Sequence, residues 1–196
     1  MTEDRPPAFR LDCGATWLNL LATSGRTFSA HPEERIATAQ RLNEWLARCE
    51  LSPVRPPDAA DLEQAIRLRE TLRALALVTL AAERPPQDAV RALSTFLADH
   101  PEPERLRLTV GDRLMREPPA DTAAALARIA RQAVDQLTGA DRHILAVCPE
   151  QDCRGVFADP GGRRRWCPSP SCASRGRVRA HRARLRAAQI EAADQD

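Results

Sequence analysis

The sequence contains no lysine and no tyrosine, and it has neither a G-x-S-x-G motif nor a glycine-rich phosphate-binding loop. Without lysine a Walker-type nucleotide site cannot form, and without G-x-S-x-G the chain lacks the serine-hydrolase elbow. Paired carboxylates with matching partners are missing as well. We therefore predict that the protein is not an enzyme. All 29 basic residues are arginines, a bias that a GC-rich genome produces, so arginine content alone identifies no partner.

Long hydrophobic runs are missing too. The most apolar stretch, residues 74–82, is about half as long as the ~20 residues that a membrane span requires, and it predicts a buried helix. The first residues do not show the basic region followed by an apolar one that marks a secretory signal. We therefore expect a cytoplasmic protein whose six cysteines are reduced or metal-bound rather than disulfide-bonded.

Charge is distributed unevenly along the chain. Between residues 142 and 186 there are eleven arginines and three acidic residues, a formal charge of +8. Residues 1–141 carry −3 and the last ten residues another −3, within a total of +2. The 196 residues suffice for one main domain with a small appendage. A mildly acidic body with a strongly basic C-terminal segment points to nucleic-acid contact by that segment.

The body is predicted to be mostly helical. Pro32, followed by two acidic residues, is expected to open a helix near residue 31, because apolar residues then recur every three or four positions up to Cys49. Asp58 or Asp61 is expected to cap a long helix that ends before the prolines at 85–86. Two shorter helices are expected over residues 88–98 and from Asp121 to Gly139.

Two stretches favour β structure. Residues 9–11 predict a short strand, and residues 105–115 alternate apolar and polar side chains around Gly111-Asp112, which predicts a hairpin. The predicted fold class is therefore mainly α with a small β element (α+β), followed by a four-cysteine zinc finger.

The zinc finger is predicted from the spacing Cys148-x4-Cys153-x13-Cys167-x4-Cys172. Two close cysteine pairs separated by a short loop are typical of a tetrahedral zinc site, in which four thiolates close the coordination shell. We therefore expect one structural Zn²⁺ bound by these four cysteines, with no open position for catalysis. Cys49 lies on the apolar face of its predicted helix, and Cys13 has no histidine nearby in sequence that would activate it.

A basic helix is predicted to follow the metal site, from residue 173 to about residue 190. At 100° per residue, Arg175, Arg179, Arg182 and Arg186 fall within roughly 60° of one another, next to an apolar face with Val178, His181 and Leu185. Such an arginine stripe is suited to follow a phosphate backbone or to enter the major groove. A second basic cluster, Arg163, Arg164 and Arg165, precedes Trp166-Cys167.

These residues resemble the CGNR-type zinc finger. The similarity rests on the four cysteines, on Phe157-Ala158-Asp159, on Arg164-Arg165-Trp166 and on the basic run from Val178 to Arg184. The body resembles the stress-induced (ABATE-like) regulator domain that precedes this finger, through residues 9–11, 18–23 and 42–46. The chain looks like a divergent member: Ala173-Ser174 replaces the Gly-Asn of the motif, and the loop from Asp159 to Arg164 is about two residues short. In the body, Asn19 and Ala22 stand where the family tends to have Asp and Asn.

The resemblance implies an α-rich regulator domain over residues 1–140, a zinc finger with a basic helix over 141–190, and an acidic tail over 191–196.

The leading hypothesis is a zinc-dependent transcription regulator whose arginines bind DNA while the body senses an effector or dimerises. The alternative is a zinc-stabilised protein-interaction module that docks on an acidic partner without binding DNA. RNA binding is a weaker third reading, because Phe157 and Trp166 are the only aromatic residues of the finger and Trp166 is expected to pack the knuckle. A single finger buries little surface on DNA and binds weakly, so a homodimer or an auxiliary contact is a reasonable expectation.

Overall fold

The computed structural model describes residues 7–193, with side chains up to residue 186. It contains six α-helices, one short 3-10 helix and three separate antiparallel strand pairs within this range. The helices are α1 (Thr16–Leu21), α2 (Ala39–Arg48), α3 (Ala59–Leu80), α4 (Gln87–Asp99), α5 (Thr122–Thr138), the 3-10 helix η1 (Ala140–Ile144) and α6 (Pro170–Ala193). The strands are β1 (Ser24–Gly25), β2 (Glu33–Glu34), β3 (Leu106–Leu108), β4 (Leu114–Arg116), β5 (Leu145–Val147) and β6 (Val156–Ala158).

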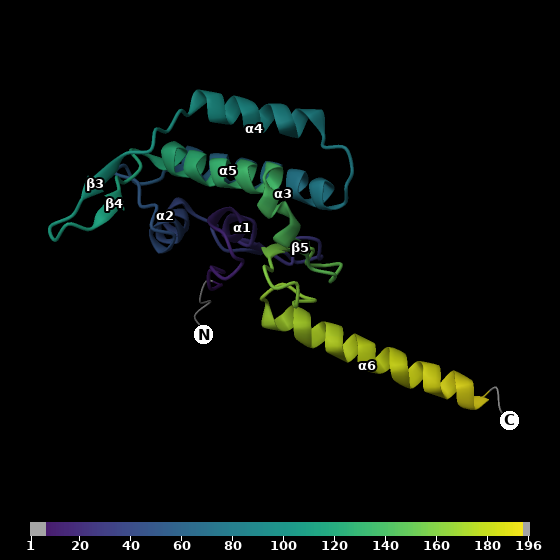
Figure 1. Ribbon diagram of the computed structural model, residues 1–196. Helices are drawn as coiled ribbons and strands as arrows, with labels where there is room; N and C mark the ends of the chain where they lie inside the picture. Colours follow the sequence, from purple (N-terminus) through teal and green to yellow (C-terminus); the bar gives the residue numbers. More distant parts are fainter. Residues whose placement is uncertain (1–6, 194–196) are drawn as a thin grey trace.

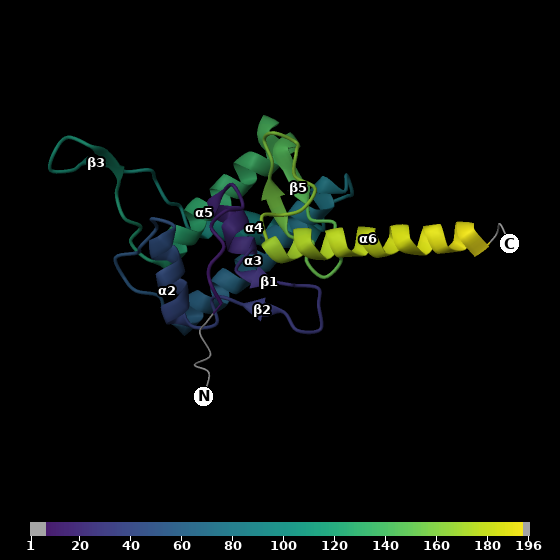
Figure 2. The ribbon, with the colours of Figure 1, turned by 90° about the horizontal axis from the view of Figure 1, so that it is seen from below.

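Helices α3 and α5 form the centre of the body. Helix α4 covers them on one side, α1 and α2 lie on the other, and α6 projects away from the rest of the molecule (Figure 1). The view from below shows the same separation of α6 from the body (Figure 2). The predicted mainly α fold with small β elements is confirmed. No helix among residues 7–193 has the length and apolar character needed to cross a membrane.

The helix starts of the body are set by side-chain caps. The carboxylate of Asp58 accepts a hydrogen bond from the Asp61 amide, and the Asp61 carboxylate accepts one from the Asp58 amide, so both predicted residues form one capping box at the start of α3. Asp121 caps α5 in the predicted place. The predicted helix at residues 88–98 is α4, which lacks a side-chain cap.

The predicted helix start at residues 31–34 is wrong. Glu33 and Glu34 form strand β2, paired with β1, and helix α2 begins only at Ala39, where the Thr38 hydroxyl accepts a hydrogen bond from the Arg41 amide. The acids that suggested a helical first turn bind arginines instead, since Glu34 pairs with Arg69 at 2.7 Å. The last helix also starts earlier than predicted, at residue 170 rather than 173.

The strand predicted for residues 9–11 does not form. Arginine side chains bind the backbone just before this segment: Arg35 donates to the carbonyl of Ala8 and Arg41 to that of Pro7. The Arg41 guanidinium also lies over the Phe9 ring, 4.0 Å from its centroid. The segment is therefore held by arginine side chains and pairs with no strand that the structure describes.

The hairpin predicted for residues 105–115 is confirmed as β3–β4, with Leu108 opposite Leu114. Its turn is closed by a hydrogen bond from the Thr109 amide to the Arg113 carbonyl and one from the Asp112 amide to the Thr109 carbonyl. Gly111 has a φ of +108°, which favours glycine. All of its strand residues are exposed, so the alternation that predicts the strands does not bury one face here.

One hydrophobic core extends from the body into the segment that carries the cysteines. Trp17 and Trp45 are fully buried in the body, and Phe157 of β6 is equally buried in the same cluster. The amide of Ala158 donates to the carbonyl of Cys13 at 2.8 Å, which joins β6 to the start of α1. The strand pair β5–β6 is thus seated directly on the body. The predicted acidic tail lies outside the described residues from position 194 onward.

Candidate metal centre and basic helix

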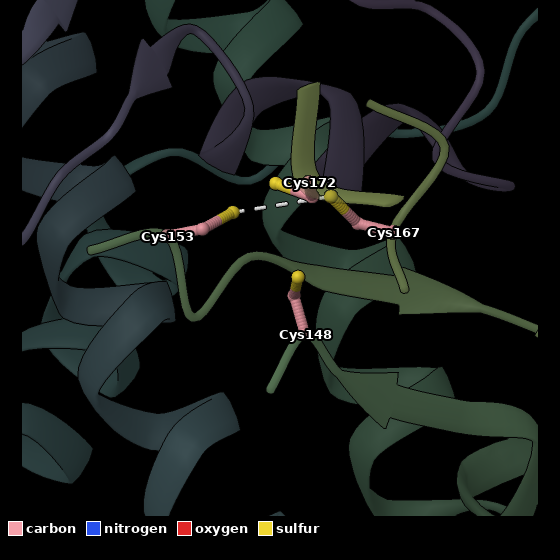
Figure 3. A group of neighbouring side chains, drawn as sticks. All are labelled: Cys148, Cys153, Cys167 and Cys172. Carbon is pink, nitrogen blue, oxygen red and sulfur yellow. Dashed lines mark hydrogen bonds between the residues drawn. The ribbon is translucent and has the colours of Figure 1, made fainter. Parts of the chain in front are cut away.

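The four motif cysteines come from the turn of a strand pair, a loop and a helix. Cys148 follows β5, Cys153 lies in the turn before β6, Cys167 ends the loop after β6, and Cys172 is in the first turn of α6. Their sulfur atoms all lie within 4.8 Å of one another and converge on one point (Figure 3). The structure therefore brings together all four residues that the spacing singles out.

The donor set fits a tetrahedral zinc ion. At a Zn–S distance of about 2.3 Å, neighbouring sulfurs of a tetrahedral site stand about 3.8 Å apart, and the Sγ atoms of Cys153 and Cys167 are 3.9 Å apart. Backbone bonds shape the knuckle: Cys148 donates to the Gly155 carbonyl, and Cys153 and Arg154 both donate to the Glu150 carbonyl, each at 2.9 Å. A closed shell of four thiolates assigns the metal a structural role.

Hydrogen bonds among the clustered thiols shift their pKa values in opposite directions. Hydrogen bonds from Cys153 and Cys167 lower the pKa of Cys148 to about 2. The same bond to Cys148 raises the pKa of Cys153 to about 12, and the pKa of Cys167 also rises because its proton is held by Cys148 and Cys153. The thiols of Cys153 and Cys167 therefore stay protonated beside the Cys148 thiolate, and a bound metal ion displaces their protons.

Cys13 and Cys49 stand apart from the metal centre. Burial raises the pKa of Cys13 to about 11 and that of Cys49 to about 12. Both thiols therefore stay protonated at neutral pH, which makes them poor nucleophiles. The expected place of Cys49 on the apolar side of its helix agrees with its packing against the core.

Two acidic residues between the first cysteines hold helix α6 in place. Glu150, only 2% exposed, accepts hydrogen bonds from the Trp166 indole at 3.2 Å and from the Arg179 guanidinium at 2.5 Å. Asp152 accepts one from Arg175 at 3.2 Å, and Arg175 also donates to the Cys172 sulfur at 3.5 Å. Sequence reasoning missed both acids. Their signal is the pair of carboxylates between the first two cysteines of a segment that is otherwise strongly basic.

The seven arginines that sequence analysis singles out therefore fall into separate groups. Arg175 and Arg179 are bound to the knuckle acids, while Arg182 and Arg186 lie further along α6 and are exposed. The other three lie in the loop before Trp166: Arg163, Arg164 and Arg165, the last placed over the Trp166 ring at 5.1 Å from its centroid. The Arg164 amide donates to the Asp159 carboxylate at 2.6 Å, which fixes this loop.

A buried ionic network joins several elements of the body. Arg69, 4% exposed, donates to Glu34, Glu70 and the Thr23 hydroxyl. Arg73 bonds Glu70 and the carbonyl that ends α1, at Leu21. These bonds join α1 and the β1–β2 region to α3 by charge-assisted contacts.

The two body positions that depart from the family pattern have structural partners. The side-chain oxygen of Asn19 accepts a hydrogen bond from the Cys13 amide at 3.0 Å, and Asn19 is buried. At Ala22 the backbone carbonyl accepts a hydrogen bond from Arg35 at 3.3 Å, and the backbone amide donates to the Leu18 carbonyl at 3.0 Å. Asn19 thus orders the loop that contacts β6.

Comparison with known families agrees with this geometry. The family model ABATE, described as "Putative stress-induced transcription regulator", matches residues 14–140, and the CGNR zinc finger model matches residues 145–185. No curated protein matches the chain. Neither description is that of an enzyme. Because the first match covers more than half of the sequence and the second covers the four clustered cysteines, the chain belongs to the ABATE family and carries a CGNR zinc finger that binds one structural Zn²⁺.

Proposed function

We propose that this protein is a zinc-dependent DNA-binding transcription regulator of the cytoplasm. The observation that carries the proposal is helix α6, which leaves the metal centre at Cys172, projects from the body and bears six arginines (Figure 1). When Zn²⁺ is bound, it closes a thiolate shell and supplies structural rigidity. The protein's own residues then present the basic surface.

The electrostatics of the finger favour a polyanion. Four thiolates around Zn²⁺ leave a net −2 at the metal, and the +8 of residues 142–186 still outweighs it. Arg175 and Arg179 form ion pairs with Asp152 and Glu150, which partly neutralise their charge. We therefore assign most of the phosphate contact to the arginines of α6 beyond the finger and to the cluster Arg163, Arg164 and Arg165, which form no ion pair among the described residues.

The division into a regulator domain over 1–140, a finger over 141–190 and an acidic tail over 191–196 is part of this proposal. The regulator domain is the element on which an effector or a second copy of the chain acts. Leu145, Val156 and Phe157 share the core of the body, so a change in the body reaches the finger through packed side chains.

The test is fluorescence anisotropy with the zinc-loaded full chain and mixed-sequence duplex DNA, titrated across salt. Neutralising about four phosphates gives a slope of log K against log salt of roughly −3 to −4. The double substitution Arg182→Ala/Arg186→Ala is expected to weaken binding and to reduce this slope by about two. Arg91→Ala, an exposed arginine on α4, is the matched control and leaves both unchanged. Absence of binding at roughly 50 to 100 mM salt rejects the proposal.

A protein-interaction module without DNA binding is the second candidate, and the β3–β4 hairpin favours it. Leu106, Leu108 and Leu114 are 57%, 65% and 67% exposed on one small hairpin. Exposed apolar clusters of this kind mark contacts with other proteins. Loss of a partner on Leu108→Ser, together with no uptake of duplex DNA by the unchanged chain, favours this function.

A further inference from the structure

Helix α6 is fixed to the finger by one of its faces. Cys172 and Gly176 are buried, and Arg179 reaches Glu150. At 100° per residue these three positions lie within roughly 60° of one another on the helix surface. That side faces the knuckle, and the helix extends beyond it away from the body in both views (Figures 1 and 2).

The opposite face carries a ridge of small, apolar and polar side chains. Its members, which we call the distal ridge, are Ser174, Val178, His181 and Leu185, at spacings of four, three and four residues. They occupy an arc of roughly 60° whose centre points away from the finger. All four are exposed, Val178 by 47% and Leu185 by 53%. Solvation of a basic helix does not account for two large apolar side chains aligned in this way.

Arginines border the distal ridge on both sides. Arg177 and Arg184 lie to one side and Arg182 and Arg186 to the other, each roughly 70° to 110° from the centre of the ridge. All four are exposed, and none forms an ion pair among the residues that the structure describes. An apolar strip between two cationic rows complements a major groove, because the groove is about 12 Å wide, a helix is about 10–12 Å across, and a phosphate strand runs along each edge.

We propose that α6 enters the major groove of duplex DNA with the distal ridge toward the base edges. Val178 and Leu185 contact thymine methyl groups, and the two arginine rows contact the phosphates of opposite strands. This inference rests on the proposed function and names its sequence-reading residues. From Ser174 to Leu185 the helix rises about 16 Å, which corresponds to about five base pairs at ~3.4 Å each.

The arginine stripe predicted from the sequence then does not read base edges. Arg175 and Arg179 point toward carboxylates of the knuckle, so they are not free to read guanine edges across the groove. The sequence preference therefore comes from apolar contacts with thymine rather than from arginine–guanine pairs.

The experiment starts with selection from random duplexes by the zinc-loaded full chain. The selected duplex is then compared with a copy in which deoxyuridine replaces thymidine, which removes only the methyl groups. Unchanged protein is expected to bind the deoxyuridine duplex about fourfold more weakly for each lost contact. Val178→Ala/Leu185→Ala is expected to bind the two duplexes equally, while its affinity for mixed-sequence DNA stays within about twofold.

Two matched variants complete the test. Arg177→Ala/Arg184→Ala is expected to weaken binding to every duplex and to reduce the salt slope by about two, with the selected motif unchanged. Leu108→Ala, at an exposed apolar residue on the hairpin, is expected to leave the binding of every duplex unchanged.

The outcomes separate this inference from the proposed function. If the unchanged protein binds duplex DNA but tolerates deoxyuridine, or if the Val178/Leu185 variant selects the same motif, the distal ridge does not read bases and the regulator proposal stands. If the protein binds only single strands or an acidic polypeptide, and no duplex at roughly 50 to 100 mM salt, both proposals fail.

Discussion

The indole of Trp166 occupies the space in which a side chain at Gly176 would stand. A Cβ atom at position 176 would come within 2.4 Å of three indole atoms. The same indole donates a hydrogen bond to Glu150, so one aromatic ring joins the loop before Cys167, the knuckle and α6. Glycine at position 176 allows this close approach because it has no Cβ atom.

Gly176→Ala is therefore expected to destabilise the finger, although the exchange normally stabilises a helix by about 0.5–1 kcal/mol. Overpacking against Trp166 is expected to cost about 1–3 kcal/mol, measured by denaturant unfolding of the zinc-loaded protein with Trp fluorescence. Ser174→Ala, at an exposed position of the same helix, is the control. A more stable Gly176→Ala protein would contradict this packing.

Glu150→Gln tests the anchor of α6. The amide retains an acceptor for Trp166 but loses the charge paired with Arg179, so the unfolding free energy is expected to fall by about 1–3 kcal/mol. Freed Arg179 is expected to tighten binding to mixed-sequence duplex DNA and to steepen its salt slope by about one. Glu83→Gln, at an exposed site after α3, is the control. Weaker DNA binding by a folded Glu150→Gln protein would show that the anchor, rather than free charge, limits contact.

Zinc binding is expected to release protons. In the metal-free cluster the pKa of Cys148 is lowered by its hydrogen bonds, while the pKa values of Cys153 and Cys167 are raised, so the latter two thiols give up protons to the metal at neutral pH. Zinc affinity should consequently rise with pH and fall in acid. Competition titration against a chromogenic chelator at several pH values measures this. Cys148→Ser is expected to lose tight zinc binding and Cys13→Ser to retain one zinc per chain.

Acid is expected to weaken the body through Glu70. Burial acts to raise the pKa of Glu70, but its pairs with Arg73 and Arg69 outweigh burial and lower it. A carboxyl whose pKa is lower in the folded state stabilises the fold above its unfolded pKa, about 4.3, and this contribution is lost as pH falls through the folded value. Glu70→Gln should flatten the acid limb of a stability–pH curve. Glu63→Gln, whose partner Arg67 is exposed, should leave that limb as it is.

Local signals were sufficient to predict the metal centre and most helix boundaries. The cysteine spacing defines a ligand set without knowledge of the rest of the fold, and Asp58 and Asp121 cap helices through residues three positions away. Pro32 with Glu33 and Glu34 also has the local pattern of a helix start, but that prediction was wrong. Glu34 instead binds Arg69, which is 35 residues away in the sequence.

The partners of the arginines were not accessible from the sequence. Helical periodicity placed Arg175, Arg179, Arg182 and Arg186 on one stripe, but Glu150 lies 29 residues from Arg179 and meets it only because the knuckle folds back onto α6. Alternation of apolar and polar residues likewise predicted the β3–β4 hairpin. It could not predict that the leucines of the hairpin are exposed, because their burial depends on whether another element packs against them.

The single-sided attachment of α6 makes the helix a lever. Its described end lies about 25 Å from Gly176, at 1.5 Å per residue. A tilt of about 10° at the zinc knuckle would displace that end by about 4 Å, more than the ~3.4 Å step between stacked base pairs. An adjustment of the body too small to disturb its core would thus be enough to move the helix tip out of register with a DNA target.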